Sequence, residues 1–155
     1  MIAIRSAGPS DARALAELRW EFRAGRDAPT EQHDTFIARC AAWIDRELGD
    51  AGSCRSWIAE DIDDGRRIVG QIWLRPIDKL PNPVGERERH AYISNLYVAP
   101  ASRGGIGTKL LRTALEWASA NGVDRVVLWP TARSRTLYLR HGFTPKGDVL
   151  ELTCR

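Results

Sequence analysis

The sequence predicts a single domain of the mixed α/β class, and three observations carry this prediction. Two segments near the N-terminus have apolar residues at helical spacing. The pair Asp64-Gly65 lies between two β-prone runs, which is a strong hairpin signal. A glycine cluster at residues 104–107 then joins a β-prone run to a long helical pattern. With 155 residues, of which 43% are hydrophobic, the chain is long enough for one domain over residues 1–155 with a core of its own.

The first elements are a strand and a helix. Residues 2–5 alternate and predict a strand, which Gly8 and Pro9 end. Ser10 or Asp11 is the expected cap of the following helix. The apolar face of this helix consists of Leu15, Leu18 and Phe22.

A second helix and a β-hairpin are expected next. Thr30 is the expected N-cap of the second helix, which stops at Gly49. Its apolar positions are Ile37, Cys40, Ala41, Ile44 and Leu48. Residues 56–60 and 67–74 predict two strands, joined by a turn at residues 63–66.

The middle of the chain combines a strand with a helix that glycines open. Residues 91–98 are β-prone, and residues 99–102 stop the strand. Gly104, Gly105 and Gly107 then precede residues with helical periodicity. Glycines at a helix start leave backbone N–H groups uncovered at the positive end of the helix dipole. This arrangement is typical of phosphate binding.

The C-terminal part predicts two more strands and a short helix. Asn121 and Gly122 end the preceding helix, and residues 126–129 are fully apolar, which is typical of a buried strand. Residues 134–141 predict a short helix that Gly142 closes. A last strand is predicted in the tail from the alternation of Val149, Leu150 and Leu152.

Cysteine use and charge argue against several classes of function. Cys40, Cys54 and Cys154 are odd in number and lack histidines at metal-ligand intervals, so free thiols and no metal site are expected. The net charge of +3 comes from scattered basic residues, which argues against a nucleic-acid partner. No apolar run is long enough for a signal peptide or a membrane span, so a cytoplasmic protein without a membrane partner is expected.

Two local motifs remain ambiguous when each is taken alone. The glycine cluster is neither a dinucleotide fingerprint, because Leu110 stands at the last glycine position, nor a P-loop, because Lys109 follows Thr108. It fits a tight strand-to-helix connection as well as a phosphate site. Tyr138, four residues before Gly142, equally fits a half-buried packing residue.

The two motifs together resemble the GCN5-related N-acetyltransferase (GNAT) superfamily. The matching segments are Val98-Ala99-Pro100, the run from Arg103 to Leu111, and Leu137-Tyr138 before Gly142-Phe143. The similarity extends along nearly the whole chain in the order of the elements. It implies a three-layer αβα fold with a mixed, mostly antiparallel central sheet that is splayed between its fourth and fifth strands.

The resemblance implies an N-acetyltransferase that moves an acetyl group from acetyl-CoA directly to an amine of a small molecule or protein. Acetyl-CoA is the co-substrate, and no metal is implied. The pantetheine arm is expected along the main chain of Leu96, Tyr97 and Val98. The pyrophosphate is expected on a turn formed by Arg103, Gly104, Gly105, Ile106, Gly107 and Thr108. Tyr138 has the place of the family's general acid, since a phenol with a pKa of about 10 can protonate a departing thiolate.

Two departures from the family pattern limit this interpretation. The usual loop is Arg/Gln-x-x-Gly-x-Gly/Ala, and only Gly104 separates Arg103 from Gly105, so the loop is one residue short and weaker pyrophosphate binding is expected. Ser94 stands near the position where many members have a catalytic Glu. These departures motivate the alternative of a non-catalytic acyl-CoA-binding regulatory domain. The general base is unassigned, and surface or structural roles compete for each candidate: Glu21, Glu86, Glu88, His90 and His141.

The acceptor amine is the partner that the resemblance implies, and its identity is open. Its site is expected between the first two helices and the loop at residues 75–89. Several aromatic residues are either core or pocket walls: Trp20, Phe22, Trp43, Trp73 and Trp129. Because such domains often dimerise, a homodimer is also considered.

Overall fold

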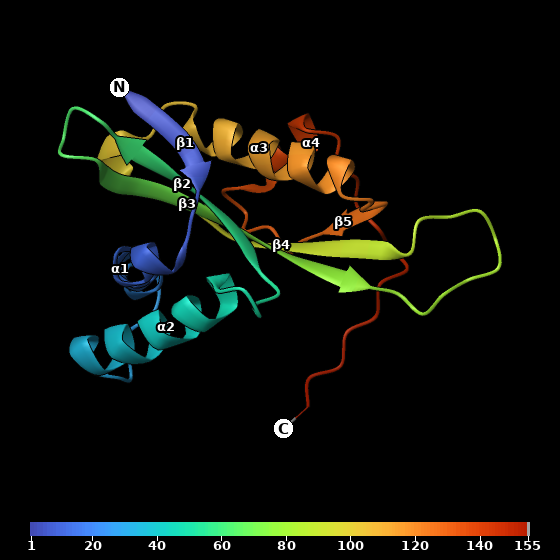
Figure 1. Ribbon diagram of the computed structural model, residues 1–155, viewed down its shortest axis with the longest axis horizontal. Coiled ribbons are helices and arrows are strands. Elements are labelled where there is room, and N and C mark those ends of the chain that lie inside the picture. The colour runs from blue at the N-terminus through green and yellow to red at the C-terminus, as the bar shows by residue number, and fades with distance from the viewer. Residues whose placement is uncertain (155) are drawn as a thin grey trace.

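A five-stranded sheet forms the centre of the molecule in the computed structural model, which describes residues 1–154 (Figure 1). The strands lie in sequence order, β1-β2-β3-β4-β5; all neighbours are antiparallel except β4 and β5, which are parallel. The strands are β1 (Ile2–Ser6), β2 (Arg55–Asp61), β3 (Arg67–Asp78), β4 (Arg89–Val98) and β5 (Arg125–Val127). The helices are η1 (Pro9–Asp11), α1 (Ala12–Ala24), α2 (His33–Leu48), η2 (Pro100–Ser102), α3 (Ile106–Ala120) and α4 (Arg135–Arg140).

Helices cover both faces of this sheet, as the sequence predicts. Helices α1 and α2 lie on one side, and α3 and α4 lie on the other (Figure 1). Each face has its own buried cluster, because successive side chains of a strand point to opposite faces. On β3, for example, Ile72 and Leu74 belong to the cluster of α3, whereas Trp73 belongs to the cluster of α1 and α2.

The strand β4 separates from β5 part of the way along its length. The two strands pair only through His90, Ala91 and Tyr92, while β4 continues to Val98. The pairing of β4 with β3 also shifts by one residue between Tyr97 and Ser94. Asn95 lies within this shift with a φ of 58°, a left-handed conformation that asparagine tolerates better than most residues. This β-bulge and the separation of the strands confirm the predicted splay.

The elements before β4 match their predictions except at several ends. Helix α2 begins at His33, with Gln32 as its N-cap, so the expected cap Thr30 is wrong. Strand β3 continues to Asp78, beyond the predicted end at residue 74. The longer strand has a physical reason, because residues Leu74 to Asp78 pair with Ile93 to Arg89 and form an arm with β4.

Two C-terminal predictions are wrong. Residues 126–129 do not form a buried strand: β5 ends at Val127, and the side chain of Trp129 is 64% exposed and contacts Tyr92 edge-on at 5.3 Å. The apolar run lies at the last strand of the described sheet, where neighbours cover it only in part. The tail forms no strand among residues 144–154, and Leu150 is 96% exposed, because an alternating segment becomes a strand only where a neighbour pairs with it.

None of the helices within residues 1–154 combines the length and the apolar character needed to cross a membrane.

Candidate functional site

A turn with two left-handed glycines opens α3. Gly104 has a φ of 143° and Gly105, the N-cap of α3, a φ of 81°; a Cβ at either residue would meet no atom within 4 Å. No side chain caps the helix, so its first N–H groups have no side-chain acceptor. The helix is held in place by its buried face, which consists of Ile106, Leu110, Leu111, Ala114 and Ala118. The turn therefore presents uncovered main-chain donors on a buried support.

The end of β4, the glycine turn and α4 lie next to one another. Arg103 donates a hydrogen bond from Nε to the carbonyl oxygen of Val98 over 3.4 Å. A Cβ built at Gly107 would lie 3.8 Å from Cδ2 of Leu137 and 4.0 Å from Cγ2 of Val98. Leu137 precedes Tyr138 on α4. The fold thus brings α4, which is distant in the sequence, next to the end of β4 and the glycine turn.

Tyr138 is held rigidly beside this turn. Its side chain is 8% exposed, and its ring packs edge-on against Phe143 at 5.6 Å. The main-chain N–H of Phe143 donates to the carbonyl oxygen of Tyr138, and the left-handed Gly142 permits this closure of the helix. The hydroxyl has no hydrogen-bond partner among residues 1–154, and burial raises the pKa of the phenol above its ordinary value. Tyr138 therefore remains protonated at neutral pH.

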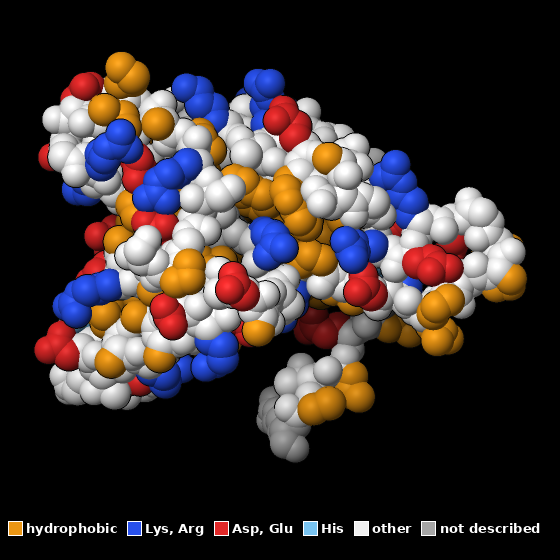
Figure 2. Space-filling view, viewed as in Figure 1, with side chains coloured by type: hydrophobic (Ala, Val, Ile, Leu, Met, Phe, Trp, Pro, Cys, Tyr) orange, Lys and Arg blue, Asp and Glu red, His pale blue; other side chains and the backbone are white. Residues whose placement is uncertain are grey.

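Apolar side chains gather at the centre of the face seen in Figure 2, over the region in which Figure 1 shows β5 and α4, and basic side chains lie beside them. The exposed apolar side chains of β5, α4 and the connection between them are Val127, Trp129 and Leu139.

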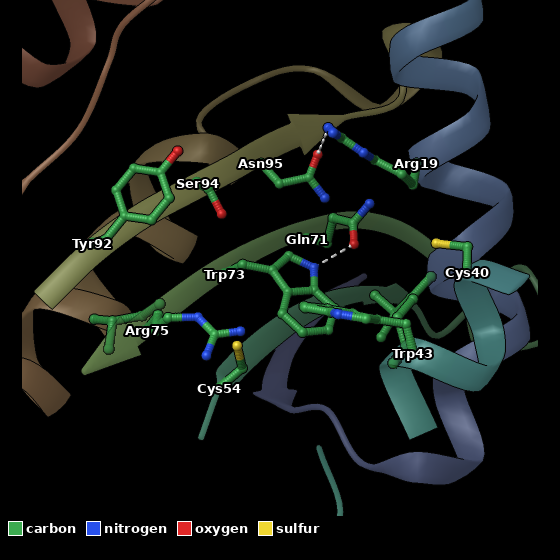
Figure 3. Close-up of a pocket in the computed structure, with 13 residues that line it drawn as sticks. Arg19, Cys40, Trp43, Cys54, Gln71, Trp73, Arg75, Tyr92, Ser94 and Asn95 are labelled. Atoms are coloured by element: carbon green, nitrogen blue, oxygen red, sulfur yellow. Dashed lines mark hydrogen bonds between the residues drawn. The ribbon is translucent and has the colours of Figure 1, made fainter. Parts of the chain in front are cut away.

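A cavity of about 280 Å³ lies on the other face of the sheet, between α1, α2, β3 and β4 (Figure 3). Aromatic rings form much of its wall. Trp43 and Trp73 contact each other with ring centroids 5.7 Å apart, and Tyr92 closes the side formed by β4. The remaining lining residues are Leu15, Arg19, Cys40, Ile44, Cys54, Gln71, Leu74, Arg75, Ser94 and Asn95.

The polar lining contains several hydrogen-bond donors. Arg19 donates from Nη1 to Oδ1 of Asn95 over 2.8 Å, which ties α1 to the bulge of β4. Gln71 is fully buried and accepts a 2.8 Å hydrogen bond from Nε1 of Trp73. Arg75 extends along the cavity in Figure 3, and its Nη1 donates to Oγ of Ser53 over 2.6 Å.

Neither thiol of the cavity is an activated nucleophile. Burial raises the pKa of Cys54 to about 11 and also raises the pKa of Cys40. Both side chains therefore stay as neutral thiols near neutral pH, where only a thiolate reacts as a nucleophile.

The base candidates from the sequence lie elsewhere. None of the five, Glu21, Glu86, Glu88, His90 and His141, lines the cavity. Glu86 pairs with Lys79 at 3.2 Å in the loop between β3 and β4, and His141 bonds through Nδ1 to the carbonyl oxygen of Leu137 over 2.8 Å. The described lining contains no carboxylate and no imidazole.

The expected acceptor walls are found in part. Trp43, Trp73 and the helices α1 and α2 line the cavity, whereas the arm beyond Arg75 does not. Trp20 packs instead against His33 and Phe36 on the outer side of α1 and α2. Phe22 stacks on Tyr97 with ring centroids 5.1 Å apart.

Sequence reasoning missed three polar residues of this cavity: Arg19, Gln71 and Asn95. A signal existed for Gln71, because it is the one polar residue in the run from Ile68 to Leu74. Asn95 also interrupts an apolar strand next to Ser94, and an Asn at such a place is typical of a bulge with a positive φ. Arg19 carried no signal, because an arginine on an amphipathic helix usually faces solvent.

Comparison with solved structures identifies the fold. A structure described as a predicted acetyltransferase with acetyl-CoA, from Clostridium acetobutylicum, has a TM-score of 0.78 and 24% identity, over 99% of this chain and 96% of that one. A GCN5-related N-acetyltransferase from Ralstonia eutropha JMP134 has a TM-score of 0.76 and 27% identity, over 99% of both chains.

Comparison of sequences leads to the same family. The chain is 30% identical over 150 residues to a mycothiol acetyltransferase of Beutenbergia cavernae, which corresponds to 92% of this chain and 45% of the relative. It thus spans about half the length of that relative. The model of the acetyltransferase (GNAT) family matches residues 12–143, which include both the glycine turn and Tyr138. The chain therefore belongs to the acetyltransferase (GNAT) family.

Proposed function

We propose that the protein transfers an acetyl group from acetyl-CoA directly to an amine nitrogen. The observation that carries this proposal is the bulged, splayed strand β4, because it borders both special features of the fold. Its end adjoins the glycine turn and α4, and Ser94 and Asn95 line the cavity on the opposite face. A gap between β4 and β5 lets two ligands that enter from opposite faces meet.

The residues of the glycine turn fit the pyrophosphate of acetyl-CoA. The space beside Gly104 and Gly105 is open, and the first N–H groups of α3 lack a side-chain cap, so they are free to donate to phosphate oxygens. Each interaction of this kind at a helix N-terminus contributes roughly 0.3–1 kcal/mol. The pairing of β4 with β5 ends at Tyr92. The main chain of Leu96, Tyr97 and Val98 therefore does not pair with β5 and is available to an extended pantetheine arm. When bound, acetyl-CoA supplies an acetyl group that is activated as a thioester.

The chain's own groups then position the reactants and move one proton. The cavity holds the acceptor so that its neutral nitrogen faces the gap in the sheet, which replaces a bimolecular encounter with a fixed approach. A main-chain N–H at the bulge of β4 stabilises the negative charge that develops on the carbonyl oxygen. The Tyr138 hydroxyl donates its proton to the departing thiolate, and its raised pKa keeps that proton in place until then. The attacking nitrogen loses its extra proton to water as the amide forms, and water returns a proton to Tyr138.

The amine enters the reaction already deprotonated. The described lining offers no carboxylate or imidazole as a base, so the amine loses its proton to water before attack. Ser94 can hold such a water through its hydroxyl group. The rate is therefore expected to follow the neutral fraction of the acceptor.

A small-molecule acceptor fits the cavity better than a protein segment. The cavity is about 280 Å³ in volume, which is near the lower end of ordinary small-molecule sites. The relative with 30% identity is named for mycothiol, which supports the same choice. The cytoplasmic location and the homodimer expected from the sequence remain predictions.

A second candidate, a non-catalytic acyl-CoA-binding domain, is motivated by the short loop and by Ser94. Calorimetric titration with acetyl-CoA, followed by measurement of thiol release with a panel of amines, separates the two candidates. Binding together with amine-dependent thiol release is expected. Binding without thiol release for any amine would support the second candidate, and absence of binding would contradict both.

A further inference from the structure

The amide of Gln71 has one orientation only. Its Oε1 accepts from Nε1 of Trp73 over 2.8 Å, and an indole nitrogen can only donate, so the oxygen must face Trp73. The amide nitrogen Nε2 therefore points to the opposite side, where it is buried without any partner. A buried donor without an acceptor destabilises the protein, and a ligand atom with a lone pair can remove this penalty.

Asn95 is oriented by the same reasoning. Its Oδ1 accepts from Arg19, and arginine can only donate, so the two N–H groups of the Asn95 amide face away from Arg19. Figure 3 shows this nitrogen on the side of Gln71, with both amides beside the cavity. Two residues that could otherwise present either an oxygen or a nitrogen are thus both fixed as donors.

The charge near these amides is positive. The described lining contains Arg19 and Arg75 and no acidic residue. Arg75 is partly balanced by Glu47, at 3.4 Å, whereas Arg19 forms no ion pair within residues 1–154 and is held by the neutral Asn95. Partial burial lowers the pKa of the Arg19 guanidinium, because part of this charged group is removed from water.

We propose that the acceptor is an amine that also carries a carboxylate, and that Gln71, Asn95 and Arg19 bind this carboxylate. The inference rests on the proposed acetyl transfer, which requires the amine. A carboxylate has two oxygens with lone pairs, enough to accept from both amides and from the guanidinium. The apolar walls formed by Trp43, Trp73 and Tyr92 accommodate the rest of the molecule.

Two matched sets of acceptors test the carboxylate: phenylalanine, phenylalaninamide and phenethylamine, and leucine, leucinamide and 3-methylbutylamine. The kcat/KM values are compared per neutral amine, because the three members of each set differ in amine pKa. In the wild type, at least one amino acid is expected to exceed its amide by about tenfold or more, since a site with fixed donors rejects a ligand that leaves them unpaired. Equal values for amino acid and amide in both sets would overturn the proposal.

Two variants test whether Gln71 and Arg19 recognise the carboxylate. Gln71→Glu keeps an acceptor for Trp73 and replaces the free donor by an oxygen, so the preference for the carboxylate is expected to fall about tenfold or to reverse. Arg19→Gln, at a partly exposed position, is expected to lower it as well and covers the case in which Gln71→Glu does not fold. Arg13→Gln is the matched control: it removes the same charge from α1, but its side chain is 79% exposed and lies outside the lining. A preference unchanged in Arg19→Gln, and in Gln71→Glu where it folds, would overturn the proposal.

A binding measurement separates this inference from the proposed activity. Phenylacetate and 4-methylpentanoate carry the carboxylate without the amine, and calorimetry with CoA present measures their binding without any acetyl transfer. Binding that Arg19→Gln weakens about tenfold and Arg13→Gln does not would support the carboxylate site even if no amine were acetylated. No binding of either acid, together with acetylation of amines that lack a carboxylate, would overturn the site while the transfer activity stands.

Discussion

Tyr138 has a buried ring and a hydroxyl without a hydrogen-bond partner in residues 1–154. Loss of the hydroxyl alone is therefore expected to affect catalysis and not packing. Tyr138→Phe keeps the packing against Phe143, so the fold and the affinity for acetyl-CoA are expected to change little. Turnover is expected to fall by about 10²–10⁴-fold, the usual contribution of a general acid. Steady-state kcat and the calorimetric Kd for acetyl-CoA measure the two effects separately. Unchanged turnover in a folded variant would remove Tyr138 from the mechanism.

The pKa of Tyr138 also predicts the pH dependence of turnover. The acid form of the phenol is the active one, and burial raises its pKa, so the group stays active throughout the neutral range and is lost only above about pH 10. The neutral fraction of the amine grows with pH. The rate is therefore expected to rise from neutral pH and to fall only at strongly alkaline pH, with the alkaline fall absent in Tyr138→Phe. A fall that begins near pH 7 would contradict this assignment.

A single substitution at the start of α3 tests the proposed pyrophosphate site at the glycine turn. Gly105→Val places a β-branched side chain at a φ of 81°, which strains the backbone by about 1–3 kcal/mol and covers the open turn. We expect the affinity for acetyl-CoA to fall at least tenfold, measured on protein that circular dichroism shows to be folded. Gly122→Val is the matched control, because Gly122 has a φ of 76° and equally open surroundings at the other end of α3. Equal losses of affinity in both variants would mean that backbone strain, rather than blockage of the glycine turn, weakens the binding of acetyl-CoA.

Arg5 lies on β1, the first strand of the sheet, and connects three elements. From β1 it donates to Asp11 of η1 and to Glu60 of β2, with 2.8 Å between Nη2 and Oδ1 of Asp11 and 2.8 Å between Nε and Oε1 of Glu60. This guanidinium lowers the pKa of both carboxyl groups. The two carboxylate side chains are almost fully buried, whereas the arginine is partly exposed, so solvent weakens part of the interaction.

The network predicts a stability loss that depends on pH. Arg5→Met is expected to lower the free energy of unfolding by about 1–3 kcal/mol at pH 7, because the buried Asp11 loses its ion-pair partner and Glu60 keeps only Arg66, at 3.1 Å. Since the folded pKa values are lowered, this stabilisation is present above the unfolded values near 4 and is lost as pH falls through the folded values. Urea unfolding at pH 7 and pH 3 should therefore show a smaller difference at pH 3. The solvent-accessible pair Arg39–Glu31 supplies the control, since Arg39→Met is expected to lower the free energy of unfolding much less than Arg5→Met.

In the proposed mechanism, the molecule as a whole separates two binding sites onto the two faces of one sheet. The glycine turn and Tyr138 lie with α3 and α4, and the aromatic cavity lies with α1 and α2. The bulged strand β4 borders both, and it pairs with β5 only through His90, Ala91 and Tyr92. We propose that an acetyl donor and an acceptor bind on these opposite faces and react beside β4.

Much of this architecture could be predicted from local patterns. The periodicity of α3 and the Asp64-Gly65 hairpin are strong local signals, and both are confirmed. The exposure of the apolar run at β5 could not be predicted, because the burial of residues up to Trp129 depends on which neighbours cover them. The donors of the cavity depend on partners far apart in the sequence, such as Arg19 with Asn95. No local pattern contains such a pairing.

The proposed function is tested most directly by measuring acetyl transfer itself, through mass spectrometry of the acceptor and release of the CoA thiol. The protein is mixed with acetyl-CoA and the amine panel at a pH at which part of each amine is neutral. At least one amine is expected to gain one acetyl group for each thiol released, at a rate that depends on the protein concentration and falls in Tyr138→Phe. Tight binding of acetyl-CoA with thiol release no faster than in buffer, for every amine, would contradict the proposed function.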